Sequence, residues 1–151
     1  VAIEYPEEMA GLILIGSGAR LRVSSEIFRG IEADFKAAAS QLVQWCYGPG
    51  ASEKVVKWGF EQLLTKQPEV LLHDFKACKE FDRMSKISSI KHPALVVCGS
   101  EDSMTPPKFS HYLSANLLRA TLRIIEGAGH MVMVENAFKV NASILKFLSA
   151  L

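Results

Sequence analysis

Three short apolar runs, each ended by glycine, constrain the fold of this chain more than any other feature. The runs are GLILI at 11–15, PALVVCG at 93–99 and TLRII at 121–125. Each run has the length of a strand and is far too short to span a membrane. Continuous apolar runs of this kind are typical of strands buried on both faces of a parallel sheet. The pattern therefore predicts three buried parallel strands in an α/β protein.

Helix-type periodicity fills the segments between and after these runs. Residues 24–89 contain several apolar faces, interrupted at Gly48-Pro49-Gly50 and near Pro68. This segment is long for a simple crossover and is interpreted as a small helical subdomain. A crossover helix is predicted at 107–116, and an amphipathic helix at 136–151. Because the strands would be joined by right-handed crossovers, their carboxyl-end loops should gather at one rim of the sheet.

Charge and cysteine content limit the classes of function. The 17 basic and 16 acidic residues leave a net charge of +1, which favours neither a nucleic-acid nor a membrane partner. The three cysteines are widely spaced, which predicts neither a disulfide framework nor a metal site, and favours reduced thiols and a cytoplasmic location. Val1–Pro6 lacks a signal-peptide pattern and looks like the interior of an element.

Two side chains at this rim are candidates for catalysis. Asp102 follows the second predicted strand in GSEDSMTPP, and His130 follows the third in GAGHM. Taken alone, Asp102 could equally shape its turn or cap the next helix, and a lone His is more often a polar surface residue. Together, however, they occur in the order of acid and then base that a hydrolase triad requires.

Four segments resemble the C-terminal part of small α/β-hydrolases of the carboxylesterase, enol-lactonase and proline-iminopeptidase type. They are YPEEMAGLILIGSGARLRV at 5–23, HDFKACKEFDRM at 73–84, PALVVCGSEDSMTPPKFSHYL at 93–113 and GAGHMVMVENAFKVNASILKFL at 127–148. The resemblance implies a doubly wound α/β-hydrolase core at 1–23 and 90–151, with a helical cap at 24–89. It also implies that Asp102 is the acid and His130 the base of a Ser-His-Asp triad, with no metal or organic cofactor.

The chain departs from this family at the nucleophile. No G-x-S-x-G pentapeptide occurs in the sequence, although the family places its serine on such an elbow. Val1–Pro6 resembles the helix that follows the elbow, so the serine is expected upstream of Val1. The strands that precede the elbow and one oxyanion-hole donor are expected there too. No residue present is a good replacement; those considered are Ser17, Cys98, Ser100 and Ser103, for which turn or core roles are commoner.

The substrate expected from these features is a small, mostly apolar ester or lactone. No Arg or Lys cluster is apparent at the rim beyond Arg20 and Arg22. The aromatic residues of the helical segment could line an acyl pocket, although such residues most often only pack; they are Trp45, Tyr47, Trp58 and Phe60. The remaining histidines, His73, His92 and His111, are assigned no chemistry.

Two other hypotheses stay open. The chain could be a noncatalytic fragment or interaction module that retains Asp102 and His130 without a nucleophile. It could also belong to a carbon–carbon hydrolase or haloperoxidase-like member of the same fold. In an isolated chain, the strand at 11–15 would lack its upstream neighbour, and this exposed edge would favour pairing with another chain or aggregation.

Overall fold

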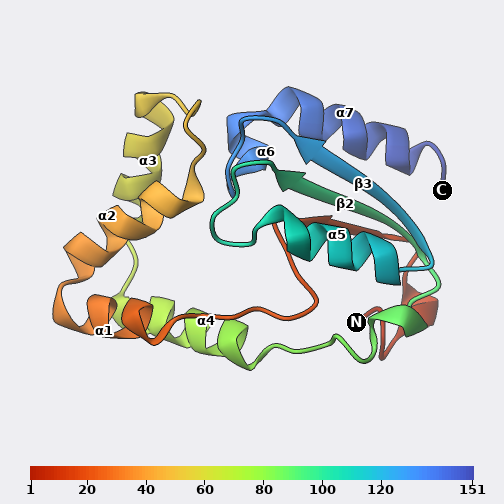
Figure 1. Ribbon diagram of the computed structural model, residues 1–151, viewed down its shortest axis with the longest axis horizontal. Coiled ribbons are helices and arrows are strands. Elements are labelled where there is room, and N and C mark those ends of the chain that lie inside the picture. The colour runs from red at the N-terminus through yellow and green to blue at the C-terminus, as the bar shows by residue number, and fades with distance from the viewer.

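Strand β2 (Pro93–Gly99) is the centre of the fold and lies between β1 (Leu12–Ile15) and β3 (Arg119–Ile125) in a parallel sheet. The computed structural model describes all 151 residues and is drawn in Figure 1. In the register, Leu12 pairs with Ala94 and Gly99 pairs with Ile125. The predicted parallel sheet is therefore confirmed, and its strand order is β1-β2-β3.

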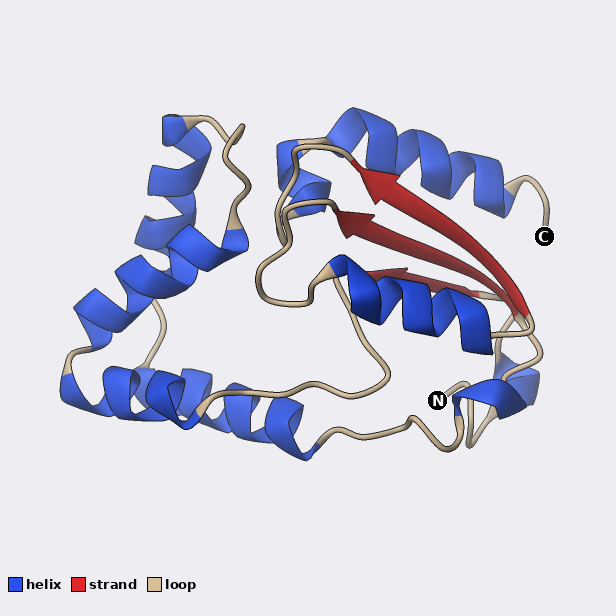
Figure 2. Ribbon diagram, viewed as in Figure 1, coloured by secondary structure: helices blue, strands red, loops and turns tan.

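Seven α-helices and two short 3-10 helices complete the chain (Figure 2). Their bounds are η1 Pro6–Glu8, α1 Ser25–Ala33, α2 Phe35–Cys46, α3 Glu53–Leu64, α4 Pro68–Glu80, η2 Ile87–Ser89, α5 Pro107–Asn116, α6 Val132–Glu135 and α7 Ala137–Leu148. Ser24, Asp34 and Ser52 cap the first three α-helices by accepting backbone N–H bonds, as such residues do at helix starts. No helix is both long and apolar enough to cross a bilayer.

The sheet carries one apolar layer on each face. On one face Ala94 and Val96 pack with Leu113 of α5, and on the other Leu95 and Val97 pack with Val140 of α7. This alternation follows from the two-residue period of a strand, and it buries every β2 residue after Pro93. Helices α1–α4 lie beside this core and cover neither face of the sheet (Figure 1).

The prediction that all three strands are buried on both faces is wrong for β1 and β3. Ile13 in β1 is 37% exposed, and in β3 only Ile125 is buried. Both are edge strands in this chain, so neither is enclosed by neighbours as β2 is. β3 also begins at Arg119, two residues before the predicted run, and α6 was not anticipated as a separate helix.

Candidate functional site

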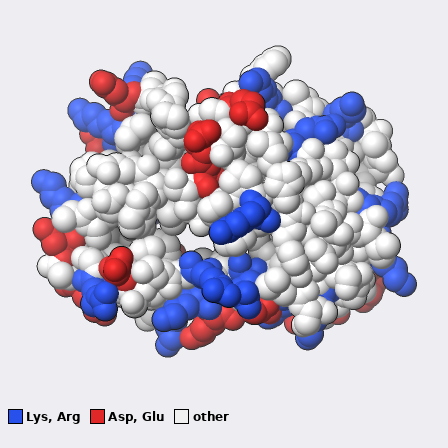
Figure 3. Space-filling view, in the orientation of Figure 1, with Lys and Arg blue, Asp and Glu red and all other residues white.

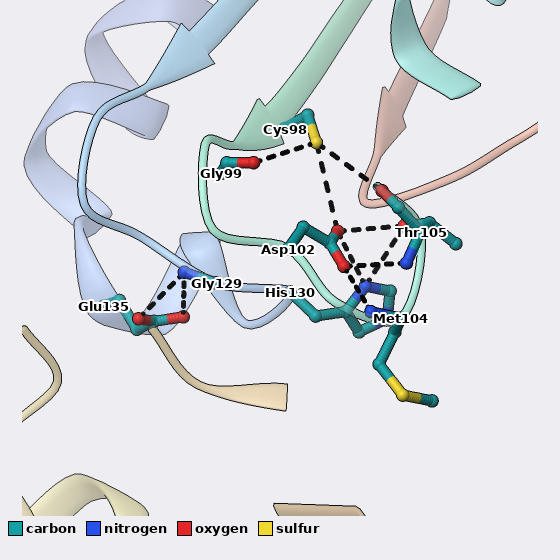
Figure 4. Close-up of polar contacts among 8 residues, drawn as sticks. All are labelled: Cys98, Gly99, Asp102, Met104, Thr105, Gly129, His130 and Glu135. Atoms are coloured by element: carbon teal, nitrogen blue, oxygen red, sulfur yellow. Dashed lines mark hydrogen bonds and ion pairs between the residues drawn. The ribbon is translucent and has the colours of Figure 1, made fainter. Parts of the chain in front are cut away.

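Asp102 lies in the loop between β2 and α5, with its side chain fully shielded from solvent. Its Oδ1 accepts hydrogen bonds from the backbone N–H groups of Met104 at 2.9 Å and Thr105 at 2.7 Å. The turn that follows the buried strand therefore fixes one carboxylate oxygen. The other oxygen, Oδ2, is left to face the next loop (Figure 4).

His130 comes from the loop after β3 and meets Asp102 at the rim. Its Nδ1 lies 3.0 Å from Asp102 Oδ2 and 3.2 Å from Thr105 Oγ1. The Thr105 hydroxyl in turn donates to the same Asp102 oxygen at 2.9 Å. Asp102 and His130, which were paired from their order in the sequence, are thus in direct contact, and the Thr105 hydroxyl lies within hydrogen-bond distance of both (Figure 4).

This hydrogen-bond pattern selects one tautomer of His130. Burial alone would raise the pKa of Asp102, but the bonds from His130 and Thr105 outweigh it and lower the pKa below its ordinary value. An ionised carboxylate can only accept hydrogen bonds. Nδ1, the imidazole nitrogen that faces Asp102, must therefore carry a proton. Nε2 is then left as an acceptor, which is the state that a general base needs.

Glycines allow the loops to approach the imidazole closely. Gly16, directly after β1, has a φ of +53° and sits against His130: an added Cβ would lie 3.1 Å from the ring atoms Cε1 and Nδ1. At Gly99, a Cβ would meet the backbone oxygens of Ala128 and Gly129. These close contacts explain the glycines that follow β1 and end β2.

Glu135 of α6 ties the His130 loop to the helical segment. Its Oε2 accepts from the backbone N–H of Gly48 at 2.8 Å, and both of its carboxylate oxygens lie 3.0 Å from the N–H of Gly129. A further bond runs from the backbone N–H of Met131 to the Cys46 carbonyl at 2.9 Å. Met131, directly after His130, is therefore bonded to the end of α2, and Gly129, directly before it, is linked to Gly48 through the Glu135 carboxylate.

A cavity of about 590 Å³ opens beside His130. Eight of its fourteen lining residues are hydrophobic, a composition typical of small-molecule pockets. Trp45, Phe75 and Ile27 line it from the helical segment, and Thr105 and His130 from the rim. Of the four aromatic residues considered above, only Trp45 lines this cavity; Tyr47, Trp58 and Phe60 do not.

None of the replacement nucleophiles considered above is hydrogen-bonded to His130. Cys98 is fully buried, and its Sγ lies near the Gly99 carbonyl and Asp102 Oδ2; burial raises the pKa of its thiol. Ser100 bonds to Glu101 and to the Gly127 N–H. Ser17 lines a different cavity, whereas Ser103 is exposed and lines the His130 cavity without bonding to the imidazole.

His73, His92 and His111 do not line the His130 cavity, and no group of three or more His, Cys, Asp or Glu side chains could hold a metal ion.

Sequence reasoning missed Thr105, Glu135 and Gly16. Only Gly16 gave a signal, as a glycine directly after a strand.

The comparisons with known proteins agree with this architecture. A model of the alpha/beta hydrolase fold matches residues 68–137. A solved thermophilic esterase is 29% identical with a TM-score of 0.90, over 99% of this chain and 60% of that one. The enol-lactonase from Burkholderia xenovorans LB400 has a TM-score of 0.90 at 19% identity, over 98% of this chain and 59% of that one.

A curated relative adds a match in sequence. The pimeloyl-[acyl-carrier protein] methyl ester esterase of Neisseria meningitidis is 24% identical, over 91% of this chain and 59% of its own length. The chain thus spans about three fifths of each of these three proteins. The parallel sheet, the flanking helices and these matches show that the chain has the α/β-hydrolase fold.

Proposed function

We propose that this chain supplies the acid and the base of a serine hydrolase that cleaves small carboxylic esters or lactones. The observation that carries the proposal is the 3.0 Å contact between His130 Nδ1 and Asp102 Oδ2 at the wall of a largely apolar cavity. A buried carboxylate that orients an imidazole, with the second ring nitrogen free, is the arrangement that activates a hydroxyl nucleophile.

In this mechanism, His130 Nε2 takes the proton of a serine hydroxyl as its oxygen attacks the substrate carbonyl. The serine belongs to a segment outside these 151 residues, as the family resemblance implies. Asp102 holds the imidazole in its Nδ1–H tautomer and stabilises the imidazolium that forms. The imidazolium then protonates the departing alcohol, and His130 next activates water, which releases the acid and restores the serine.

The cavity supports a small acyl substrate. Its volume of about 590 Å³ lies within the range of about 300–1,000 Å³ common for small-molecule sites. Residues 24–89, which contain α1–α4, would act as the cap, because Trp45, Phe75 and Ile27 of this segment face His130 across the cavity. The named relatives include esterases and an enol-lactonase. Hydrolysis of small esters or lactones agrees with the volume and the largely apolar lining of the cavity.

The partner and location proposals follow from the rest of the chain. The outer edge of β1 carries no strand, and we propose that the segment bearing the serine pairs there; without it, this edge would pair with another chain.

The protein would need no cofactor, nucleic acid or membrane. Its three free cysteines favour a reducing, cytoplasmic compartment.

The first test is an intact-mass determination on the natural protein, joined to hydrolysis of a short p-nitrophenyl ester. A mass well above 16.6 kDa, with turnover that is lost in His130→Ala, would support the proposal. The matched control is His111→Ala, which removes an exposed imidazole from α5 outside the cavity and should retain turnover.

The same experiment separates the noncatalytic alternative. A natural mass equal to that of these residues, with no ester turnover, would overturn the hydrolase proposal and make Asp102 and His130 an idle pair. If the mass is larger, the residue at the elbow decides the chemistry, because an aspartate there would point to dehalogenase-type rather than esterase chemistry.

A further inference from the structure

A second cavity adjoins the one beside His130. It has a volume of about 260 Å³ and lies between the loop after β1 and the first turns of α5. Arg22 and Phe109 line both cavities, so these two side chains border the two cavities at once. Arg22 and His130 line the same larger cavity, so a substrate that fills it would meet both side chains.

The smaller cavity is basic. Arg20, Arg22 and Lys108 line it, and no Asp or Glu lines either cavity. Arg20 is paired with Asp82 at 3.5 Å, whereas neither Arg22 nor Lys108 has a carboxylate within 4.0 Å. Figure 3 shows basic side chains beside the hollow between the cap helices and the sheet. Sequence reasoning placed only Arg20 and Arg22 near the rim, and the fold adds Lys108.

We propose that Arg22 and Lys108 bind an anionic group of the substrate, so that the preferred ester or lactone carries a carboxylate or phosphate at the end remote from the scissile bond. This inference rests on the proposed function and refines its substrate class. Guanidinium and ammonium groups without carboxylate partners bind such oxyanions through charge-assisted hydrogen bonds. The apolar surface beside His130 would hold the chain that joins the anion to the ester.

The test uses three p-nitrophenyl esters of equal chain length, ending in a methyl group, a carboxylate or a phosphate. The protein is expressed from its complete reading frame. We expect a higher kcat/KM for an anionic ester than for the neutral one, and Arg22→Gln or Lys108→Gln should lower this preference about tenfold, mainly through KM. The preference should also shrink at about 1 M salt, where charges are screened beyond roughly 3 Å.

Arg123→Gln is the matched control, because it removes an exposed charge from β3 that lines neither cavity; it should change no rate. Equal kcat/KM for the three esters in the wild-type protein, or equal losses for all three in Arg22→Gln, would overturn the anion site. Calorimetric binding of the three corresponding amides provides a readout that needs no turnover.

The two proposals fail in different ways. Anionic amides that bind to the wild-type protein but not to Arg22→Gln, without hydrolysis of any ester, would refute the hydrolase and support the anion site. Hydrolysis of all three esters with no anionic preference would support the hydrolase and refute the anion site.

Discussion

Gly16 lies directly against the imidazole of His130, so close that a methyl group at position 16 would come within 3.1 Å of two ring atoms. The first residue after β1 therefore helps to set the position of a side chain that follows β3. The contact depends on the positive φ of Gly16, which L-residues with a side chain rarely adopt.

Gly16→Ala should reduce ester turnover more than its effect on stability explains. The new methyl group would displace the His130 ring, and the positive φ would cost about 1–2 kcal/mol of folding free energy. Gly127→Ala is the control, because Gly127 has a φ of +74° but no atom within 4 Å of an added Cβ. For Gly16→Ala, both kcat and the free energy of unfolding measured by urea denaturation should fall. For Gly127→Ala, only the free energy of unfolding should fall. Similar kcat losses in the two variants would refute the steric explanation.

Thr105→Val should slow turnover about tenfold, because it removes a hydroxyl whose hydrogen bonds are worth about 1–1.5 kcal/mol. That hydroxyl lies between Asp102 and His130. Thr105→Ser keeps the hydroxyl and should retain most of the activity. The measurement is kcat for a p-nitrophenyl ester. Equal losses in both variants would show that the Thr105 methyl group, and not its hydroxyl, matters.

Asp102→Asn should lower the free energy of unfolding near neutral pH, and this deficit should shrink in acid. The pKa of Asp102 is lowered in the folded state. Its stabilising contribution is therefore complete above the unfolded pKa of about 3.8 and is lost as pH falls through the lower folded pKa. Urea denaturation of both proteins from pH 6 to pH 2.5 tests this. A constant difference across that range would contradict it.

Glu135→Ala should lower the free energy of unfolding by about 2 kcal/mol or more, since each buried donor left without a partner costs about 1–3 kcal/mol. The donors are the backbone N–H groups of Gly48 and Gly129, both of which are buried. Glu32→Ala, at an exposed position in α1, is the control and should change little. Chemical denaturation compares the two, and equal losses would contradict the role of Glu135.

Iodoacetamide at pH 8 should modify Cys78 before the other two thiols. Cys78 is half-buried and lines the cavity beside His130. Burial raises the pKa of Cys46 to about 11 and also raises that of the buried Cys98, which leaves little reactive thiolate at either. Peptide mass spectrometry gives the order of labelling, with unfolded protein as the reference. Early labelling of Cys98 would contradict the packing of β2.

The local pattern of the chain determined the elements that carry the site. Strand β2 and helix α5 have the predicted bounds, because Pro and Gly delimit the apolar run of the strand and Pro107 begins the helix. Asp102 and His130 could be paired before the structure was known, because the carboxyl ends of neighbouring parallel strands meet at one edge. Their catalytic roles and the cap boundaries at residues 24 and 89 stay predictions.

Only the tertiary structure decided which strands are edges and which further residues complete the rim. The exposure of Ile13 in β1 depends on which neighbours enclose the strand, which its apolar sequence does not encode. The Thr105 hydroxyl bridges Asp102 and His130. Arg22 and Lys108, which come from a loop and from helix α5, line the same cavity. Sequence periodicity reports which face of one element is apolar, whereas contacts between distant elements arise only when those faces pack together.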